Sequence, residues 1–476
     1  MAIQTFDQLL RGGIEKHGNT SYVYEEAGDR GFIPHTYNEF YIDIRKTADK
    51  LISLGYGGKK IILYGANSYA WAVCYMAIIA YVGVVAPIDY VWGQNEILNV
   101  LNDISYDNSI RKNNNNSSDN DCDNSNGIAL ILHDRNLEIN VDVPKISLQD
   151  KTLFKSSGDR IFVKNTDDIH KIVYTSGTTS RPKKVELTSR NLFANINALF
   201  EIFNMSSNDR ILAIMPLHHI TPVLSSLVYP FYLGINIYIA SDYTKMMKYL
   251  RTVKPTLLFA VPKVYEKILE RLPRILRPLL PFLFGGKARG LYSAAAVLNK
   301  ITIETYQKWG LPLLQGYGST ETSAIVSVEL LEGYKLGSVG RVLSNQDVKI
   351  INNEICVKGE NVARDFLSED GYFHTGDIGY LDDENWLYFV SRKKRLIKLS
   401  NGRNVYPDEL EELLLQCGNI FSAHIFDNND CVCAKIYANS VTDAESAINK
   451  VNDSIPYYMK IKEWEFGRDI KSSYKI

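Results

Sequence analysis

A hydroxyl-rich loop carries the clearest chemical signal in the sequence. Residues 175–183 read Thr-Ser-Gly-Thr-Thr-Ser-Arg-Pro-Lys and follow an apolar run that ends at Tyr174. Hydroxyls and backbone N–H groups bind phosphate oxygens, and Lys183 would neutralise their charge. Gly177 gives backbone freedom where a ligand approaches. The pattern GxxxxGK[ST] is absent, so this is not a Walker A loop. A polar surface turn has a similar composition, so the loop alone only indicates a phosphate site.

Further segments combine residue types that suit a nucleotide site. They are Met215-Pro-Leu-His-His219, Gly316-Tyr-Gly-Ser-Thr-Glu-Thr322, Tyr372-Phe-His-Thr-Gly-Asp377 and Lys471-Ser-Ser-Tyr-Lys-Ile476. The carboxylate of Glu321 is a ligand that Mg²⁺ prefers, and Asp377 offers two oxygens to hydroxyl groups. The two histidines also suit a packed core, and a lysine at 475 also suits a solvated tail. The order of the segments is therefore more informative than any one of them.

Taken in order, these segments resemble the motifs of the adenylate-forming superfamily, which contains acyl-CoA synthetases, luciferases and peptide-synthetase adenylation domains. The loop at 174–183 resembles YTSGTTGxPKG, the segment at 215–219 resembles PLxH, and the segment at 316–322 resembles GYGxTE. Elements similar to the family's later motifs follow in order: Gly337-Ser-Val-Gly340, Arg392, Leu399-Ser-Asn-Gly402, Asn404-Val-Tyr-Pro407 and the terminal Lys-Ser-Ser-Tyr-Lys. The resemblance covers nearly the whole chain, from Thr36 to Lys475.

The resemblance implies a set of site residues. It makes Lys475 the adenylation lysine between carboxylate and α-phosphate, Glu321 a ligand of Mg²⁺, His219 a neighbour of the acid and Lys394 the hinge between domains. The implied nucleotide-binding residues are Thr175, Ser176, Gly177, Thr178, Thr179, Lys183, Ala295, Tyr317, Gly318, Thr320, Asp377, Arg392 and Gly402. Thr175 joins Glu321 as a metal ligand. ATP, Mg²⁺ and coenzyme A as co-substrate are the implied cofactors.

Several positions depart from the family pattern. Ser180 and Lys184 replace glycines of the loop, and a side chain at positive φ would cost on the order of 1 kcal/mol. Residues 293–296 read Ser-Ala-Ala-Ala in place of SGGAP, residues 363–366 read Ala-Arg-Asp-Phe in place of a Gly-Tyr pair, and Ser391 replaces a glycine. The charged site residues are retained, which favours a working enzyme over an inactive relative.

The implied reaction has two halves. A carboxylate attacks the α-phosphorus of ATP, giving an acyl-adenylate and pyrophosphate, and the thiol of coenzyme A then displaces AMP. The segment at 215–219 resembles that of long-chain fatty acyl-CoA synthetases, and residues 220–223 lack the Asp that pairs an amino-acid amine. We therefore expect a medium- or long-chain fatty acid. Two alternatives stay open: transfer to a carrier-protein phosphopantetheine, and a nucleotide- or acyl-binding regulatory protein without turnover.

Composition and length bound the organisation. The 476 residues carry a net charge of −1, which gives no indication of a nucleic-acid partner. The length predicts two or three domains, and the resemblance implies an adenylation domain over 1–393 and a mobile lid domain over 394–476. The Asn-rich stretch 107–126 predicts a disordered insertion. The six cysteines match no zinc motif, Cys431 and Cys433 are expected as buried thiols, and the first residues contain no secretory signal. We expect a cytoplasmic monomer or homodimer.

The elements that must position the site alternate helices with strands. We expect strands at 60–64, 84–88, 211–215, 235–239 and 256–260, and helices at 48–54, 69–81 and 191–202. This predicts an α/β fold with parallel-rich sheets covered by helices, β-rich segments at 345–364 and 386–398, and a small α+β C-terminal domain. The uncharged stretch 68–88 is interpreted as buried helix and strand, not a membrane span. The basic and apolar stretch 263–289 could rest on a membrane surface, or cover the acyl tunnel.

Overall fold

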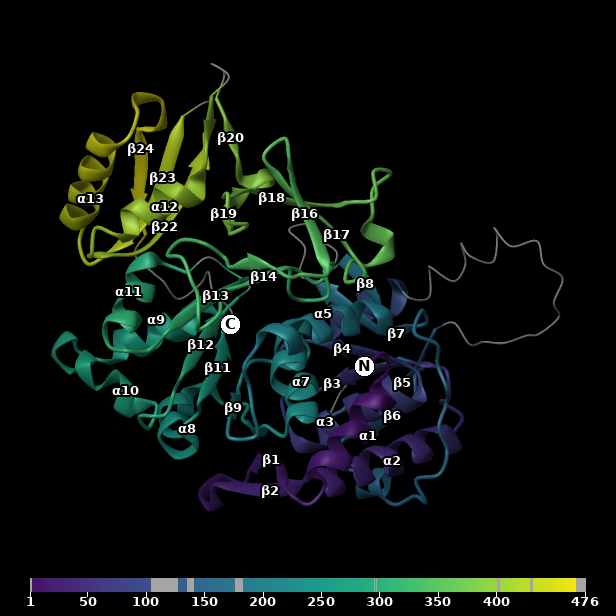
Figure 1. Ribbon diagram of the computed structural model, residues 1–476. Coiled ribbons are helices and arrows are strands. Elements are labelled where there is room, and N and C mark those ends of the chain that lie inside the picture. The colour runs from purple at the N-terminus through teal and green to yellow at the C-terminus, as the bar shows by residue number, and fades with distance from the viewer. Residues whose placement is uncertain are drawn as a thin grey trace.

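The computed structural model describes residues 2–103, 127–134, 141–175, 183–294, 296, 298–399, 403–428 and 431–467. The predicted insertion at 107–126 lies outside these ranges. Figure 1 shows two large sheets with their helices in the lower part of the molecule and the C-terminal elements at the top.

One sheet has six strands in the order β6-β5-β3-β4-β7-β8. Their bounds are β3 (Lys60–Tyr64), β4 (Val84–Ile88), β5 (Ile128–His133), β6 (Lys145–Ser147), β7 (Ile169–Thr175) and β8 (Lys183–Thr188). The pairs are parallel except β7 with β8, which is antiparallel. The loop predicted to bind phosphate therefore joins two neighbouring strands of this sheet.

Helix α3 (Tyr69–Ala77) connects β3 to β4 and continues into a π-helical segment, Ile78–Val82. Its side chains are buried apart from that of Ala70, which confirms the prediction of a core helix over 69–81. In the part of the chain that the structure describes, no helix has the length and apolarity to cross a membrane.

The second sheet has nine strands in the order β15-β14-β13-β12-β11-β9-β10-β1-β2. Their bounds are β1 (Ser21–Glu26), β2 (Phe32–Thr36), β9 (Arg210–Ala213), β10 (Asn236–Ile239), β11 (Leu257–Ala260), β12 (Gly290–Ser293), β13 (Leu313–Tyr317), β14 (Ser327–Val328) and β15 (Arg341–Val342). The central pairs are parallel, and the pairs at both edges are antiparallel. One hydrophobic cluster joins this sheet to the six-stranded sheet, so the two share a core.

The helices pack on these sheets. Their bounds are α1 (Phe6–His17), α2 (Tyr37–Ser53), α5 (Ser189–Ile202), α6 (Ile220–Val223), α7 (Tyr229–Leu233), α8 (Met246–Val253), α9 (Pro262–Arg271), α10 (Leu280–Leu283) and α11 (Lys300–Lys308). A second π-helical segment, Leu224–Val228, makes α6 and α7 one continuous helix. Helix α5 starts where β8 ends, because the Thr188 hydroxyl accepts from the Asn191 N–H in a capping box.

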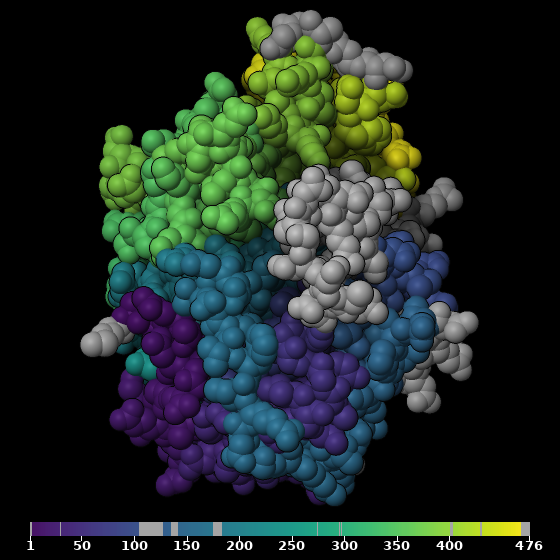
Figure 2. Space-filling model, turned by 90° about the vertical axis from the view of Figure 1, so that its right-hand side faces the viewer, coloured from purple at the N-terminus to yellow at the C-terminus, as the bar shows by residue number. Residues whose placement is uncertain are grey.

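The C-terminal part of the chain is β-rich. An antiparallel sheet contains β16 (Gln346–Ile351), β17 (Glu354–Gly359), β18 (Phe373–Leu381) and β19 (Leu387–Arg392). It is followed by β20 (Ile397–Lys398), β21 (Asn404–Val405), α12 (Pro407–Leu415), β22 (Ile420–Asp427), β23 (Val432–Ala438), α13 (Val441–Ser454) and β24 (Glu463–Phe466). Figure 2 shows the C-terminal elements, in yellow-green, stacked above the N-terminal half, in purple and blue.

These elements have a hydrophobic cluster of their own, which begins at Ile397. The predicted α/β fold with parallel-rich sheets and a small α+β C-terminal part is confirmed. The domain boundary between 393 and 394 stays a prediction.

Candidate active site

A tyrosine, an aspartate and an arginine meet at the junction of the nine-stranded sheet and the β16–β19 sheet. Tyr317 ends β13, and its hydroxyl donates to Asp377 Oδ2 over 2.7 Å. Asp377 is 2% exposed on β18, and Arg392 of β19 brings its Nε within 2.8 Å of Asp377 Oδ1. The pKa of Asp377 is raised, because burial raises it by more than the Arg392 guanidinium and the Tyr317 hydroxyl lower it. The tertiary structure thus unites three residues predicted from separate motifs.

Lys183 and Glu321 form a second part of the site. Lys183 begins β8, and its Nζ lies 3.2 Å from Glu321 Oε1 and 4.1 Å from the ring centroid of Phe366. The backbone N–H of Ala363 donates to the Glu321 carbonyl over 2.8 Å. The departure from the family pattern at 363–366 therefore supports both partners of this ion pair.

The same carboxylate fits the predicted metal. Glu321 is largely buried, and it raises the pKa of Asp377, so the two parts of the site adjoin. Mg²⁺ is held in proteins by one or two carboxylates, with water and phosphate oxygens completing its shell. Glu321 offers such an oxygen, whereas the side chain of Thr175, the other predicted ligand, lies outside the described residues.

The turn that carries Glu321 has a strained backbone. Ser323 and Ala324 have positive φ, at 57° and 109°, although both carry a Cβ. A Cβ on Gly318 would lie 2.0 Å from the Ala324 carbonyl oxygen, so only glycine fits at that position. Positive φ at a residue with a Cβ costs of order 1–3 kcal/mol and persists only when the surroundings hold it.

Two buried asparagines hold this turn. Asn195 on α5 donates through Nδ2 to the carbonyls of Thr322 and Ser323, over 2.9 Å each. Asn361 donates to the Thr322 carbonyl over 3.1 Å. Neither residue was among the site residues predicted from the sequence. An asparagine in a helix interior opposes helix propensity, which was the only signal available for Asn195.

The histidine pair lies at the start of α6. His219 precedes the helix and is exposed, although the surrounding protein desolvates its imidazole and lowers its pKa. His218 is 6% exposed, its ring centroid lies 4.1 Å from that of His219, and burial lowers its pKa to about 2. The carboxylate of Asp89 lies 3.8 Å from His218 Nε2. Both imidazoles are therefore neutral at pH 7.

Two other predicted residues lie on turns. Thr320 is half-buried on the turn beside Glu321, and Lys394 is exposed on the 3₁₀ turn Lys393–Arg395 between β19 and β20. The hinge role of Lys394 stays a prediction.

The replaced glycines have different consequences. Lys184 lies within β8 opposite Tyr174, in extended backbone, and its Nζ is 3.2 Å from Glu186 Oε1. Lys184 is not among the residues with positive φ, so the strain that a positive φ would cause does not arise at this position.

Ser391, which also replaces a glycine, is buried on β19 and donates to the Asp408 carboxylate on α12, which also accepts from Arg395. Ser391 thus attaches α12 to the β16–β19 sheet.

Part of the predicted site lies outside the described residues. These positions are Ser176, Gly177, Thr178, Thr179, Ser180, Ala295, Gly402 and Lys475.

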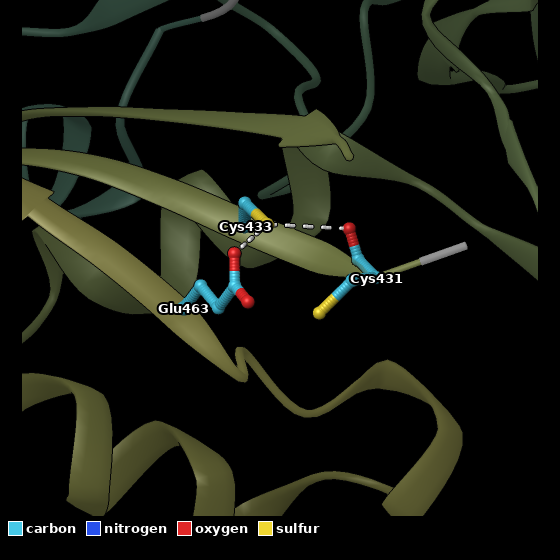
Figure 3. Close-up of side chains that lie close together, drawn as sticks. All are labelled: Cys431, Cys433 and Glu463. Carbon is cyan, nitrogen blue, oxygen red and sulfur yellow. Dashed lines mark hydrogen bonds between the residues drawn. The ribbon is translucent and has the colours of Figure 1, made fainter. Parts of the chain in front are cut away.

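A thiol cluster lies far from this site in the sequence. Figure 3 shows Cys433 and Cys431 close to Glu463, with Cys433 Sγ 3.8 Å from Glu463 Oε2. Cys433 is buried as predicted, but Cys431 is only partly buried, because it precedes β23. The pKa of Cys433 is raised to about 11. Burial is the largest cause, and the neighbouring Cys431 and Glu463 raise it further. A structural zinc site needs four ligands, so these three side chains alone do not form one.

Comparisons with known proteins agree on one family. A family model described as AMP-binding enzyme matches residues 14–367. The chain is 29% identical over 311 residues to the 2-succinylbenzoate--CoA ligase of Enterococcus faecalis, covering 60% of this chain and 62% of that protein. It is 26% identical over 471 residues to the long-chain-fatty-acid--CoA ligase FadD15 of Mycobacterium bovis, covering 82% and 75%. The alignments to the 2-succinylbenzoate ligases of E. faecalis and Bacillus cytotoxicus span 62% and 57% of their lengths.

Solved structures match over nearly the whole chain. The o-succinylbenzoate CoA synthetase of Bacillus subtilis, in complex with its acyl-adenylate intermediate, superposes with a TM-score of 0.79 at 22% identity, covering 97% of this chain and 94% of that one. The ATP-bound MatB of Rhodopseudomonas palustris gives a TM-score of 0.81 at 20% identity, covering 98% and 95%. At these identities the matches show a shared fold.

Proposed function

The chain belongs to the AMP-binding enzyme family, and from this premise we propose that it is an AMP-forming ligase that activates a carboxylic acid. ATP and the acid give an acyl-adenylate and pyrophosphate, and coenzyme A then takes the acyl group and releases AMP. The observation that carries the proposal is the adjacency of the Lys183–Glu321 pair to the Tyr317–Asp377–Arg392 group. A cation, a metal-binding carboxylate and a hydroxyl acceptor are the groups that a triphosphate, its ion and a ribose require.

The chemistry of the first half demands little proton transfer. The attacking carboxylate is already ionised at pH 7, so the enzyme has to position the reactants and neutralise charge. In this proposal Lys183 faces the phosphates, Asp377 accepts hydrogen bonds from the ribose hydroxyls, and Lys475 stands between the acid and the α-phosphate. Mg²⁺, when held by Glu321 and Thr175, would neutralise phosphate charge.

We propose an acid of the 2-succinylbenzoate type as the substrate. Relatives named 2-succinylbenzoate--CoA ligase are 29–35% identical over their aligned regions. The interior around His218 also contains polar side chains, which an alkyl chain would leave without hydrogen bonds. A medium- or long-chain fatty acid, expected from the sequence, is the second candidate. Its support is the FadD15 relative, whose alignment covers a larger share of the chain.

A pyrophosphate-release screen tests the activity. The panel contains 2-succinylbenzoate, 4-oxo-4-phenylbutanoate, dodecanoate and palmitate, each with ATP and Mg²⁺, with and without coenzyme A. We expect acid-dependent pyrophosphate release and CoA-dependent AMP release. AMP release that requires a phosphopantetheinylated carrier protein instead would identify the alternative acceptor. ATP binding without pyrophosphate release from any acid would favour the regulatory protein.

We also propose that the segment between α9 and α11 contacts a lipid surface. Ile275, Leu279 and Phe282 are 85%, 50% and 73% exposed within eight residues. Arg271 and Lys287 flank them and are exposed, which suits anionic headgroups. Figure 1 shows α10 at the outer left edge of the molecule, where a planar surface could approach it. A role as a cover of the acyl tunnel is the alternative.

Vesicle sedimentation separates the two roles. We expect the protein to sediment with vesicles of anionic phosphatidylglycerol and less with phosphatidylcholine, and the double variant I275S/F282S to stay in solution. An unchanged lipid affinity of that variant, with altered selectivity for acids, would support the tunnel cover instead. The cytoplasmic location and the monomeric or homodimeric state stay predictions.

A further inference from the structure

A lysine with no partner lies inside the core. Lys171 is on β7, is 0% exposed, and its Nζ has no hydrogen-bond partner among the described residues. The group that we find beside it is the ring of Tyr75 on α3, with Nζ 5.1 Å from the ring centroid. Lysines are almost never fully buried unless they are paired. Burial is the only cause that changes the pKa of Lys171, lowering it to about 7.

The surroundings of Lys171 contain other unpaired polar atoms. Tyr75 Oη, Trp71 Nε1 and His218 Nε2 are buried, and none has a hydrogen-bond partner in the part of the chain that the structure describes. Trp71 stacks on Tyr75 at 5.3 Å between ring centroids, and the charge of Lys171 lowers the pKa of both His218 and His219. These groups therefore share one interior region between α3, β7 and the histidine pair. Native proteins leave few buried polar groups unpaired, so a cluster of them indicates a ligand.

Two imidazoles, a phenol and a carboxylate are the titratable groups that the described residues place near the lysine. The Tyr75 ring contacts the ammonium, and the charge of Lys171 acts on His218 and His219. The imidazoles and the phenol are neutral at pH 7, and the Asp89 carboxylate, which lies 3.8 Å from His218 Nε2, has no effect on the pKa of Lys171. The missing partner is therefore an anion.

The position of Lys171 on its strand sets the length of that ligand. Lys171 lies four residues before Thr175, the last residue of β7. Four residues of strand span about 13 Å. A ligand that joins Lys171 to the start of the loop at 175–183 therefore has about the length of a small dicarboxylic acid.

We propose that Lys171 is the counter-ion for a second carboxylate of the acid substrate. One carboxylate attacks the α-phosphorus, and the other pairs with the buried ammonium. The inference rests on the proposed function and narrows it to dicarboxylic acids. An acid without the second carboxylate leaves the ammonium desolvated and unpaired, and sites with an unmatched buried polar group reject such analogues by factors of about 10⁴ in favourable cases.

A cycle of two acids and two enzymes tests the pairing. The acids are 2-succinylbenzoate and 4-oxo-4-phenylbutanoate, which lacks only the ring carboxylate, and the enzymes are the full-length wild type and K171M. We expect K171M to lower kcat/KM for the dicarboxylic acid by about 100-fold or more, with less than about 3-fold change for the monocarboxylic acid. Equal losses for both acids, or a wild-type preference for the monocarboxylic acid, would overturn the inference.

A matched control uses a second lysine near the same sheet. Burial also lowers the pKa of Lys164 to about 7, but its ammonium donates to the Gly83 carbonyl. K164M removes a partly buried lysine without touching the histidine region, so we expect it to affect both acids equally. Selective loss of the dicarboxylic acid in K164M would argue against a specific role of Lys171.

Calorimetry separates this inference from the proposed activity. Binding of the dicarboxylic acid to the wild type, measured in buffers of different ionisation enthalpy near pH 7.5, is expected to take up a fraction of a proton, because the carboxylate raises the lysine pKa. K171M is expected to take up none. Absence of binding by the dicarboxylic acid, or equal proton uptake by both proteins, overturns the anion site. Binding with proton uptake but no pyrophosphate release overturns only the proposed activity.

Discussion

The two sides of the candidate site treat buried charge in opposite ways. On the nucleotide side, the buried carboxylate of Asp377 has Tyr317 and Arg392 as partners. On the side proposed to bind the acid, the buried ammonium of Lys171 has no hydrogen-bond partner among the described residues. A charge paired within the protein is positioned before any ligand arrives, whereas an unpaired one destabilises the empty protein and is compensated only by a ligand. The comparison indicates that the fold builds the nucleotide site by itself and leaves the acid site to be completed by its substrate.

Loss of the metal-binding carboxylate should give the largest effect. We expect E321Q to lower kcat for pyrophosphate release by about 10²–10³-fold, because it removes the carboxylate proposed to hold Mg²⁺. The measurement is a Mg²⁺ titration of pyrophosphate release. D365N, which neutralises an exposed carboxylate on the neighbouring turn, serves as the control. A loss of less than about 3-fold in E321Q would show that Glu321 is not needed for charge neutralisation.

The two buried charges should respond to neutralisation with opposite signs. We expect K171M to raise the free energy of unfolding by roughly 2–4 kcal/mol at pH 7, and D377N to lower it by about 1–3 kcal/mol. The pKa of Lys171 is about 7 when folded and about 10.4 when unfolded, so the unfolded state binds more protons between these values. Wild-type stability should therefore rise with pH from 7 to 10 through this group.

Urea unfolding between pH 6 and 9 measures both changes. The difference between K171M and the wild type should be greatest at the acid end and shrink as the pH rises. A destabilised K171M would mean that the lysine is paired in the folded protein, and the comparison between the two sides would fail.

The strained turn beside Glu321 should show a smaller effect. We expect A324G to stabilise the protein by about 1 kcal/mol, because glycine adopts positive φ without a Cβ penalty. N195A should destabilise it by about 1–3 kcal/mol, because two turn carbonyls lose their donor. Thermal unfolding measures both, and A194G on the same helix controls for helix propensity. A destabilised A324G would indicate that the turn is not strained.

The contact between Ser391 and Asp408 should give the smallest effect. Removal of the hydroxyl in S391G leaves Asp408 paired with Arg395, so we expect a loss of about 1 kcal/mol or less. The rates of the two half-reactions, measured separately, show whether α12 must stay attached to β19. A faster thioester half-reaction would support a moving C-terminal part. Unchanged rates in both halves would restrict Ser391 to a structural role.

Local patterns predicted much of the fold. Strand β3 and the buried helix after it have the expected bounds, since a short apolar strand and an uncharged helix are recognisable from neighbouring residues. Helix α2 was expected over 48–54 only, yet it begins at Tyr37. Its start depends on a capping box between Thr36 and Glu39. This capping box was not used to predict where the helix begins.

The sequence by itself determined the family and the order of the motifs, and it predicted most of the charged residues of the candidate site, because these depend on residue types at close spacing. Only the tertiary structure decided that Asn195 holds the turn of Glu321, that Phe366 lies under Lys183, and that Lys171 is buried without a partner. Each of these facts joins residues far apart in the chain. A lysine in a strand can face solvent or core with the same neighbours in sequence, and its burial follows from which helices cover the sheet.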